Sequence, residues 1–276
     1  MTAFFDTHAH YDDKAFDEDR ETLLEALPGK GIARVVNVGA SLASCKRTVS
    51  LADRYDYIYA AVGIHPSETA ELEGESPDAP GGQSAESPDA LEQLKAMWNH
   101  EKCVAVGEIG LDYYWDKTHR EIQKKWFARQ LRFAGERGLP VIIHSRDAAR
   151  DTIDIMAGEK AGEIGGVVHC FSYTKETAGI FLDMGFYIGI GGVLTFQNAR
   201  KLKEAAAYIP MDRIVLETDC PYLAPAPYRG KRNSSLYLPL VAEVLAQVKG
   251  ISEEEVRRAA WENGMRLYGM KEREKI

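Results

Sequence analysis

Side chains of the types that bind divalent metals recur near the ends of β-rich segments of this sequence. They are His8, His10, Glu108, His144, His169 and Asp219. Residues i and i+2 of a strand face the same side, so a strand through His8 and His10 directs both imidazoles toward one cation. Imidazole and carboxylate ligands suit zinc, manganese and similar ions. The pattern therefore predicts a metal site rather than isolated histidines.

The size of this ligand set points to two metals rather than one. Six ligands exceed what a single catalytic zinc binds, and a carboxylate can bridge two ions about 3.5–4 Å apart. Glu108, in the middle of the strand order, is the predicted bridge and a catalytic residue. Two divalent ions bring about +4 and two carboxylates about −2, which leaves about +2 for an anionic phosphodiester. We expect hydrolysis by an activated water whose proton Asp219 accepts.

Several further residues are candidates for contacts with substrate or with the metal ligands. His65, followed by Pro66, either contacts a substrate phosphate or acts as a general acid, or it stabilises a turn. Glu217, two residues before Asp219, is predicted to orient a ligand histidine. Arg146, just after His144, either binds a phosphate or pairs with Asp147.

A basic loop and an aromatic run supply the remaining candidates. Arg229, Lys231 and Arg232 either contact the backbone of a nucleic acid or form a solvated basic loop. Tyr113, Tyr114 and Trp115 follow the fourth β-rich segment, and they could stack on a base. Cys170 and Cys220 each follow a proposed ligand, so strand alternation predicts that both turn away from the metals.

The elements that must position these residues alternate along the chain. Eight β-rich runs are predicted at 3–9, 33–39, 57–64, 103–110, 139–145, 165–172, 186–192 and 213–219. Helical stretches follow them at 18–29, 42–54, 91–100, 119–137, 147–160, 175–184, 198–208 and 236–249. This order predicts an α/β fold, a (β/α)₈ TIM barrel with its chemistry at the carboxyl ends of the strands.

An extra C-terminal helix and one alternative fold complete this interpretation. Residues 251–269 open with Ser252 and Glu255 at the spacing of a capping box, which predicts a helix packed on the barrel. The alternative is an open doubly wound sheet. No GxGxxG motif follows the first strand, which disfavours the dinucleotide-binding version of that fold.

Composition limits the function classes. The 276 residues are 45% hydrophobic and 28% charged, with a net charge of −8. This excludes a generally basic nucleic-acid-binding surface, and it fits one domain over 1–276 with a flexible polar loop at about 71–90. Four cysteines without CxxC spacing indicate a reducing cytoplasm. We expect neither export nor membrane insertion, and a monomer.

The motifs FFDTHAH, GIHP, VGEIGLDYYWD, VIIHSRDA, GVVHCFS and RIVLETDCPYLAPAPYRGKRN, spread over residues 4–268, resemble those of the TatD family of metal-dependent deoxyribonucleases. The resemblance implies one metal on His8, His10, Glu108 and Asp219, and a second on Glu108, His144 and His169. It also implies a 3′ to 5′ exonuclease on single-stranded DNA, with RNA or abasic DNA as further substrates. We expect two divalent ions per chain, zinc, manganese or magnesium.

Two other functions compete with the nuclease. An amidohydrolase or lactonase on the same scaffold often bridges its metals with a carbamylated lysine on strand four, where this chain has Glu108. A metal-stabilised binding protein would have closed coordination and no turnover, whereas catalytic sites keep an open position.

Overall fold

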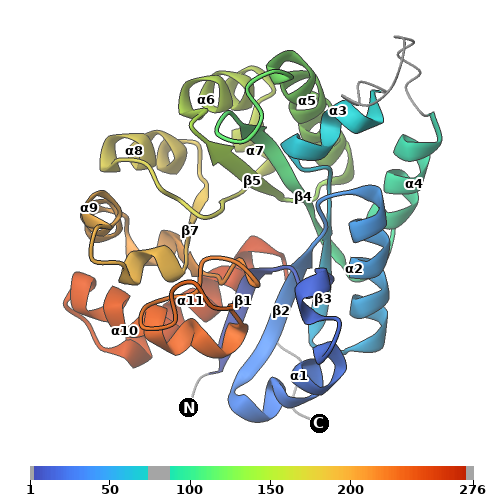
Figure 1. Cartoon of the computed structure of the whole chain (residues 1–276). Coiled ribbons are helices and arrows are strands. Elements are labelled where there is room, and N and C mark those ends of the chain that lie inside the picture. The colour runs from blue at the N-terminus through green and yellow to red at the C-terminus, as the bar shows by residue number, and fades with distance from the viewer. Residues whose placement is uncertain (1–2, 74–87, 272–276) are drawn as a thin grey trace. The chain divides into compact units, whose positions relative to one another are not determined.

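The computed structural model describes residues 3–73 and 88–271 of the chain. Strands and helices alternate along it (Figure 1). The strands are β1 Phe4–Ala9, β2 Ile32–Val38, β3 Ile58–Val62, β4 Cys103–Asp112, β5 Val141–Arg146, β6 Gly166–Val168, β7 Tyr187–Ile190 and β8 Ile214–Leu216. Their order in the sheet is their order along the chain. The predicted (β/α)₈ TIM barrel is confirmed, and the open doubly wound alternative is wrong.

Each strand is followed by at least one helix. The α-helices are α1 Arg20–Ala26, α2 Leu42–Arg54, α3 Thr69–Leu72, α4 Pro88–Trp98, α5 Arg120–Arg137, α6 Ala149–Gly158, α7 Ala161–Ile164, α8 Lys175–Asp183, α9 Arg200–Tyr208, α10 Leu238–Lys249 and α11 Glu253–Leu267. Short 3-10 turns lie at Lys14–Phe16, Pro28–Lys30, Pro66–Glu68, Gly192–Thr195, Met211–Arg213 and Ser235–Tyr237. Local signals set several ends: Ser41 caps α2, and Gly138 ends α5 in the left-handed conformation.

The chain separates into two compact units, residues 1–35 with 170–276 (unit 1) and residues 36–169 (unit 2). In unit 2, β3 pairs with β4, β4 with β5, and β5 with β6, all in parallel. Helices α5 and α6 lie against β4 and β5 (Figure 1). These strands begin with apolar runs, as expected for parallel strands covered by helices. The prediction of a single domain over 1–276 stays a prediction.

Unit 1 contains β1, the parallel pair β7 and β8, and helices α8 to α11. The predicted C-terminal helix is α11, which begins with the expected capping box of Ser252 and Glu255. This helix packs on β1: the hydroxyl of Tyr268, its C-cap residue, donates to the carbonyl oxygen of Thr7 at 2.8 Å. Gly264 lies so close to the Phe5 ring that a Cβ atom there would clash with it.

The predicted polar loop at about 71–90 lies for the most part outside the described residues. Its first two residues belong to α3 and its last three to α4. Among the helices of 3–73 and 88–271, none is long and apolar enough to cross a membrane.

Candidate metal centre

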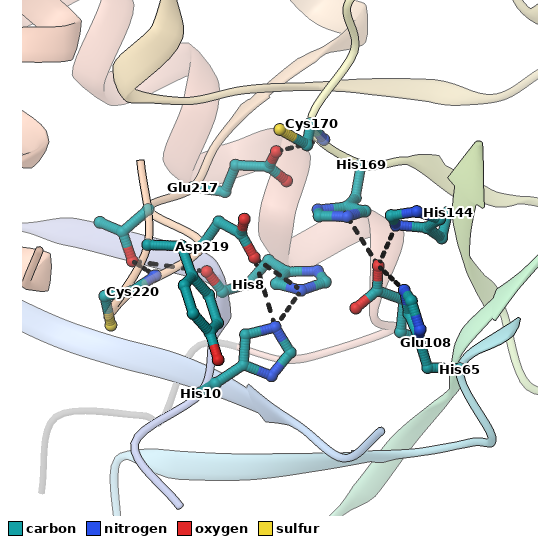
Figure 2. A network of polar contacts seen from close by, with 12 residues as sticks. His8, His10, His65, Glu108, His144, His169, Cys170, Glu217, Asp219 and Cys220 are labelled. Atoms are coloured by element: carbon teal, nitrogen blue, oxygen red, sulfur yellow. Dashed lines mark hydrogen bonds and ion pairs between the residues drawn. The ribbon is translucent and has the colours of Figure 1, made fainter. Parts of the chain in front are cut away.

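A buried carboxylate surrounded by imidazoles is the main feature of unit 2. Glu108 Oε1 lies 2.6 Å from His144 Nδ1, 2.8 Å from His169 Nε2 and 3.8 Å from His65 Nε2 (Figure 2). Glu108 is 3% exposed, and His169 is buried as well. These side chains come from β4, from β5, and from the segments that follow β3 and β6. Distant parts of the sequence thus meet at one carboxylate.

Two glycines bring β4 close enough to β5 for these contacts. A Cβ atom at Gly107 would lie 2.6 Å from Cβ of Ile142, and one at Gly110 would clash with the carbonyl oxygen of His144. The pairing register of β4 shifts between Val106 and Ile109, so the strand bulges at Glu108 and then continues to Asp112. Glu108, which the sequence placed near the end of its strand, therefore lies within β4, because the strand continues beyond the bulge.

The imidazoles keep Glu108 ionised. Burial by itself would raise the pKa of this carboxyl, but His169, His144 and His65 together hold the pKa well below its ordinary value. Burial likewise opposes the charged form of His144, yet Glu108 and Asp112 raise the pKa of His144. The donor atoms of His65, Glu108 and His144 lie within 4.8 Å of one another. Nitrogen and carboxylate donors at this spacing fit a divalent transition metal or zinc.

Asp112 is a site residue that the sequence reasoning missed. Its Oδ2 lies 3.1 Å from His144 Nε2, and its Oδ1 accepts the N–H groups of Tyr114 and Trp115. A carboxylate on the second ring nitrogen fixes the orientation of a metal-binding imidazole. The available signal was strand alternation, because residue 112 lies four positions beyond Glu108 on the same strand.

Unit 1 holds a second cluster, built from β1, the residue that follows it and the segment after β8. Nε2 of His8 and Nε2 of His10 are 3.0 Å apart, and Asp219 Oδ1 lies 3.7 Å from the first and 3.3 Å from the second (Figure 2). The backbone supports this arrangement, since Asp219 N donates to His8 O and His10 N donates to Cys220 O. The prediction that His8 and His10 face the same side is confirmed.

The buried carboxyl group of Asp6 holds the backbone on which this second cluster is built. Asp6 accepts hydrogen bonds from the hydroxyls of Thr218 and Ser235, each at 2.6 Å, and from the N–H groups of His8 and Thr218. Burial raises the pKa of Asp6 to about 7. The sequence reasoning did not single out Asp6, although it lies two residues before His8 on the same strand.

Glu217 and Cys170 lie next to each other in unit 1. Glu217 is buried, and its Oε1 accepts the N–H of Cys170, the residue after His169. Both side chains line a small pocket with Asp219. The expectation that Cys170 turns away from the metals stays a prediction, although its basis does not hold, because β6 ends at Val168 and Cys170 adopts a left-handed backbone with φ 46°. Strand alternation does not extend that far. The orienting role of Glu217 stays a prediction.

Of the roles left open for His65, the structure shows the one in the turn, and the substrate-phosphate or general-acid role stays a prediction. Its Nδ1 accepts the N–H of Ser67 at 3.2 Å and so caps the turn at Pro66–Glu68. Its Nε2 points toward Glu108. A neutral ring that accepts at Nδ1 carries its proton on Nε2. His65 thus stabilises the turn and directs a donor toward the carboxylate.

The four predicted basic residues have different surroundings. The Arg146 guanidinium lies over the ring of Tyr114, and that of Arg229 over the ring of Phe196. Lys231 is exposed. Arg232 forms two hydrogen bonds with the carboxylate of Asp19, at 2.7 and 2.6 Å. Their roles in substrate binding stay predictions, and Arg232 has the most fully engaged side chain of the four.

Comparison with known proteins agrees with the fold and the clusters. The family model described as "TatD related DNase" matches residues 5–269. The chain is 41% identical to the uncharacterized metal-dependent hydrolase YabD of Bacillus subtilis over 264 residues, which cover 96% of this chain and 98% of that protein. It is 35% identical to the uncharacterized metal-dependent hydrolase YcfH of Escherichia coli over 266 residues, 95% of this chain and 94% of that one.

A solved structure of a TatD homologue also matches this chain. The crystal structure of YjjV, a TatD homologue from Escherichia coli, matches with a TM-score of 0.85 at 30% identity, and covers 97% of this chain and 98% of that one. Fold and ligand clusters define a metal-dependent hydrolase built on a (β/α)₈ barrel. The chain belongs to the TatD family, as its motifs predicted.

Proposed function

We propose that this hydrolase cleaves phosphodiester bonds of nucleic acid, as a 3′ to 5′ exonuclease on single-stranded DNA, with RNA and abasic DNA as further substrates. The observation that carries the proposal is the buried Glu108 carboxylate, held ionised among His144, His169 and His65. A carboxylate in this position can bridge two cations, which is the arrangement that suits an in-line displacement at phosphorus. The family description as a DNase supports the same substrate class.

We propose two divalent ions per chain, zinc, manganese or magnesium. The family resemblance implies that Glu108 is a ligand of both ions. His8, His10, Asp219 and Glu108 would hold one ion, and Glu108, His144 and His169 the other. When bound, such ions lower the pKa of an attacking water and neutralise charge on the phosphate.

The protein's own groups would supply the proton transfers and the orientation. Asp219, fixed by the hydrogen bond from its backbone N–H to His8 O, accepts the proton of the attacking water. His65 offers Nε2–H to a phosphate oxygen or to the leaving oxygen, since Ser67 occupies its other nitrogen. Asp112 holds the His144 ring so that its other nitrogen, Nδ1, faces Glu108.

The test uses metal-free protein reloaded separately with zinc, manganese and magnesium. Each form is assayed on single strands labelled at the 3′ or the 5′ end, on an abasic duplex, and on a panel of lactones and amides. We expect stepwise release of the 3′ label. Cleavage of the small neutral substrates alone would instead identify an amidohydrolase or lactonase, and the absence of turnover with every metal would identify a binding protein.

We also propose that the enzyme works as a monomer in the cytoplasm. No disulfide joins the cysteines Cys45, Cys103, Cys170 and Cys220, all within the described residues, which suits a reducing compartment. Light scattering of the metal-loaded protein tests the monomer, and a doubled mass at micromolar concentration would contradict it.

A further inference from the structure

Two exposed aromatic rings and a guanidinium form a cluster on unit 2. The Arg146 guanidinium lies 4.6 Å from the centroid of the Tyr114 ring and 5.8 Å from that of Trp115. The two rings are 4.8 Å apart and meet edge to face at 88°. Tyr114 and Trp115 are 49% and 72% exposed, so two neighbouring aromatic rings are open to solvent. We call Tyr114, Trp115 and Arg146 the aromatic cluster.

The aromatic cluster is fixed next to a proposed metal ligand. Asp112 Oδ1 accepts the N–H groups of Tyr114 and Trp115, each at 2.9 Å, while its Oδ2 faces His144. Arg146 lies two residues beyond His144 on β5, and its carbonyl oxygen accepts the N–H of Tyr113. One buried carboxylate thus holds both the imidazole and the turn that carries the exposed rings.

Tyr113 differs from its two neighbours, although the sequence grouped all three. Its side chain is 8% exposed, its hydroxyl donates to Asp151, and the Arg120 guanidinium lies over its ring. The faces accessible from solvent are therefore those of Tyr114 and Trp115.

The chemistry of the aromatic cluster defines what it can bind. Flat aromatic faces stack on nucleobases of any sequence, and a guanidinium beside them can stack on a base or pair with a phosphate. Exposed Lys117 and Arg120 in the same segment add positive charge. The carboxylate of Asp116 is engaged by His119 and by the N–H of Thr118. The surface therefore complements an anionic strand that carries bases.

We propose that Tyr114, Trp115 and Arg146 form a stacking site for a nucleobase of single-stranded nucleic acid beside the metal ligand His144. This rests on the proposed function for its substrate class, and it adds the residues that hold the strand. Stacking on Trp115 requires an unpaired base, so the site selects single strands over duplex without reading sequence.

The test measures binding without cleavage. Full-length, manganese-loaded protein is titrated into two fluorescent strands of equal length and equal phosphorothioate backbone, a deoxyadenylate strand and an abasic strand with tetrahydrofuran in place of each nucleoside. We expect the wild type to bind the deoxyadenylate strand on the order of tenfold more tightly, the low end of what base stacking supplies. Equal affinity for the two strands would overturn the proposal.

Variants assign the preference to the aromatic cluster. Trp115→Ala and Tyr114→Ala should weaken binding of the deoxyadenylate strand only, Trp115→Phe should restore the preference, and Arg146→Ala should weaken binding of both strands. Tyr208→Ala and Arg200→Ala, at exposed positions on α9, are the matched controls and should bind as the wild type does. A preference unchanged by Trp115→Ala, in a variant with an unchanged melting temperature, would overturn the proposal.

The two proposals fail separately. Base-dependent binding by a protein that cleaves no nucleic acid with any metal leaves the stacking site standing and refutes the nuclease. Cleavage of DNA by a protein that binds both strands equally refutes the stacking site alone.

Discussion

His144 lies between two carboxylates on a neighbouring strand, with Glu108 Oε1 2.6 Å from its Nδ1 and Asp112 Oδ2 3.1 Å from its Nε2. A metal ion can bind one nitrogen of this ring, and the carboxylate at the other nitrogen then keeps the ring oriented. We interpret Asp112 as the group that orients the ring, because it also holds the following turn through two N–H groups. Glu108 is then the carboxylate that shares a metal with His144.

Replacing Asp112 by asparagine should weaken metal binding without removing a ligand. The amide keeps an acceptor for Tyr114 and Trp115 but loses the charge that polarises His144, so metal affinity should fall about 10- to 100-fold. Competition with a fluorescent chelator measures it. Asp116→Asn, at a carboxylate that pairs with His119, is the control and should keep wild-type affinity. An unchanged affinity in Asp112→Asn would show that Asp112 does not support the metal ligand.

The pair of Arg232 with Asp19 should contribute to stability in a pH-dependent way. The hydrogen bond from Arg232 lowers the pKa of Asp19 from 3.8 in the folded protein. A lowered carboxyl pKa adds stability above pH 3.8, and this is lost as the pH falls through the folded-state value. A double-mutant cycle with Asp19→Ala and Arg232→Ala should give a coupling of about 0.2–1 kcal/mol at pH 7, typical of exposed pairs. The coupling should shrink below pH 3.8, and an equal coupling there would contradict the assignment.

Because of this pair, Arg229 and Arg232 should differ in nucleic-acid binding. Arg232 is already neutralised by Asp19, so it should release fewer counterions from DNA than Arg229, which lies over the Phe196 ring. Arg229→Ala should flatten the dependence of log affinity on log salt for a single strand by about 0.7, the value for one phosphate contact. Arg232→Ala should change it less. Anisotropy titrations from low to high salt measure both slopes, and a larger change in Arg232→Ala would show that Arg232 exchanges Asp19 for phosphate.

The form of the substrate should matter more than its sequence. A base must leave its stack to reach a metal centre at the mouth of a barrel, which costs a few kcal/mol in a duplex. Single strands and frayed 3′ ends should therefore be cut faster than blunt duplex. The comparison uses one 3′-labelled strand, free and annealed. Equal rates on both forms would show that cleavage does not require the strand to be unpaired.

Much of the fold was predictable because local signals and burial pattern agree. Helix α2 was predicted at its observed bounds, since Ser41 accepts a hydrogen bond from Ser44 N and an amphipathic run follows. The end of α5 was predictable from Gly138. Helices α3 and α7 were not predicted, because segments of four residues are too short to show a helical period.

The site was predictable in its ligand types but less so in its geometry. Spacing alone paired His8 with His10, whereas the mid-strand position of Glu108 depends on how closely Gly107 and Gly110 let β4 approach β5. Asp112 and Asp6 were missed because the sequence does not distinguish a buried, hydrogen-bonded carboxylate from an exposed one in or near a strand. Their roles depend on partners 32 and 229 residues away, His144 and Ser235.

The most direct test of the account is the metal content and the turnover of Glu108→Ala. This carboxylate is the proposed bridge, so its loss should lower the content from about two ions per chain to one or fewer, and lower turnover on a single strand on the order of 10³-fold or more. Glu121→Ala, at an exposed glutamate that pairs with Lys124 on α5, is the control and should keep both values. Glu108→Ala with two ions per chain and a near-normal rate would contradict the two-metal site on which the account depends.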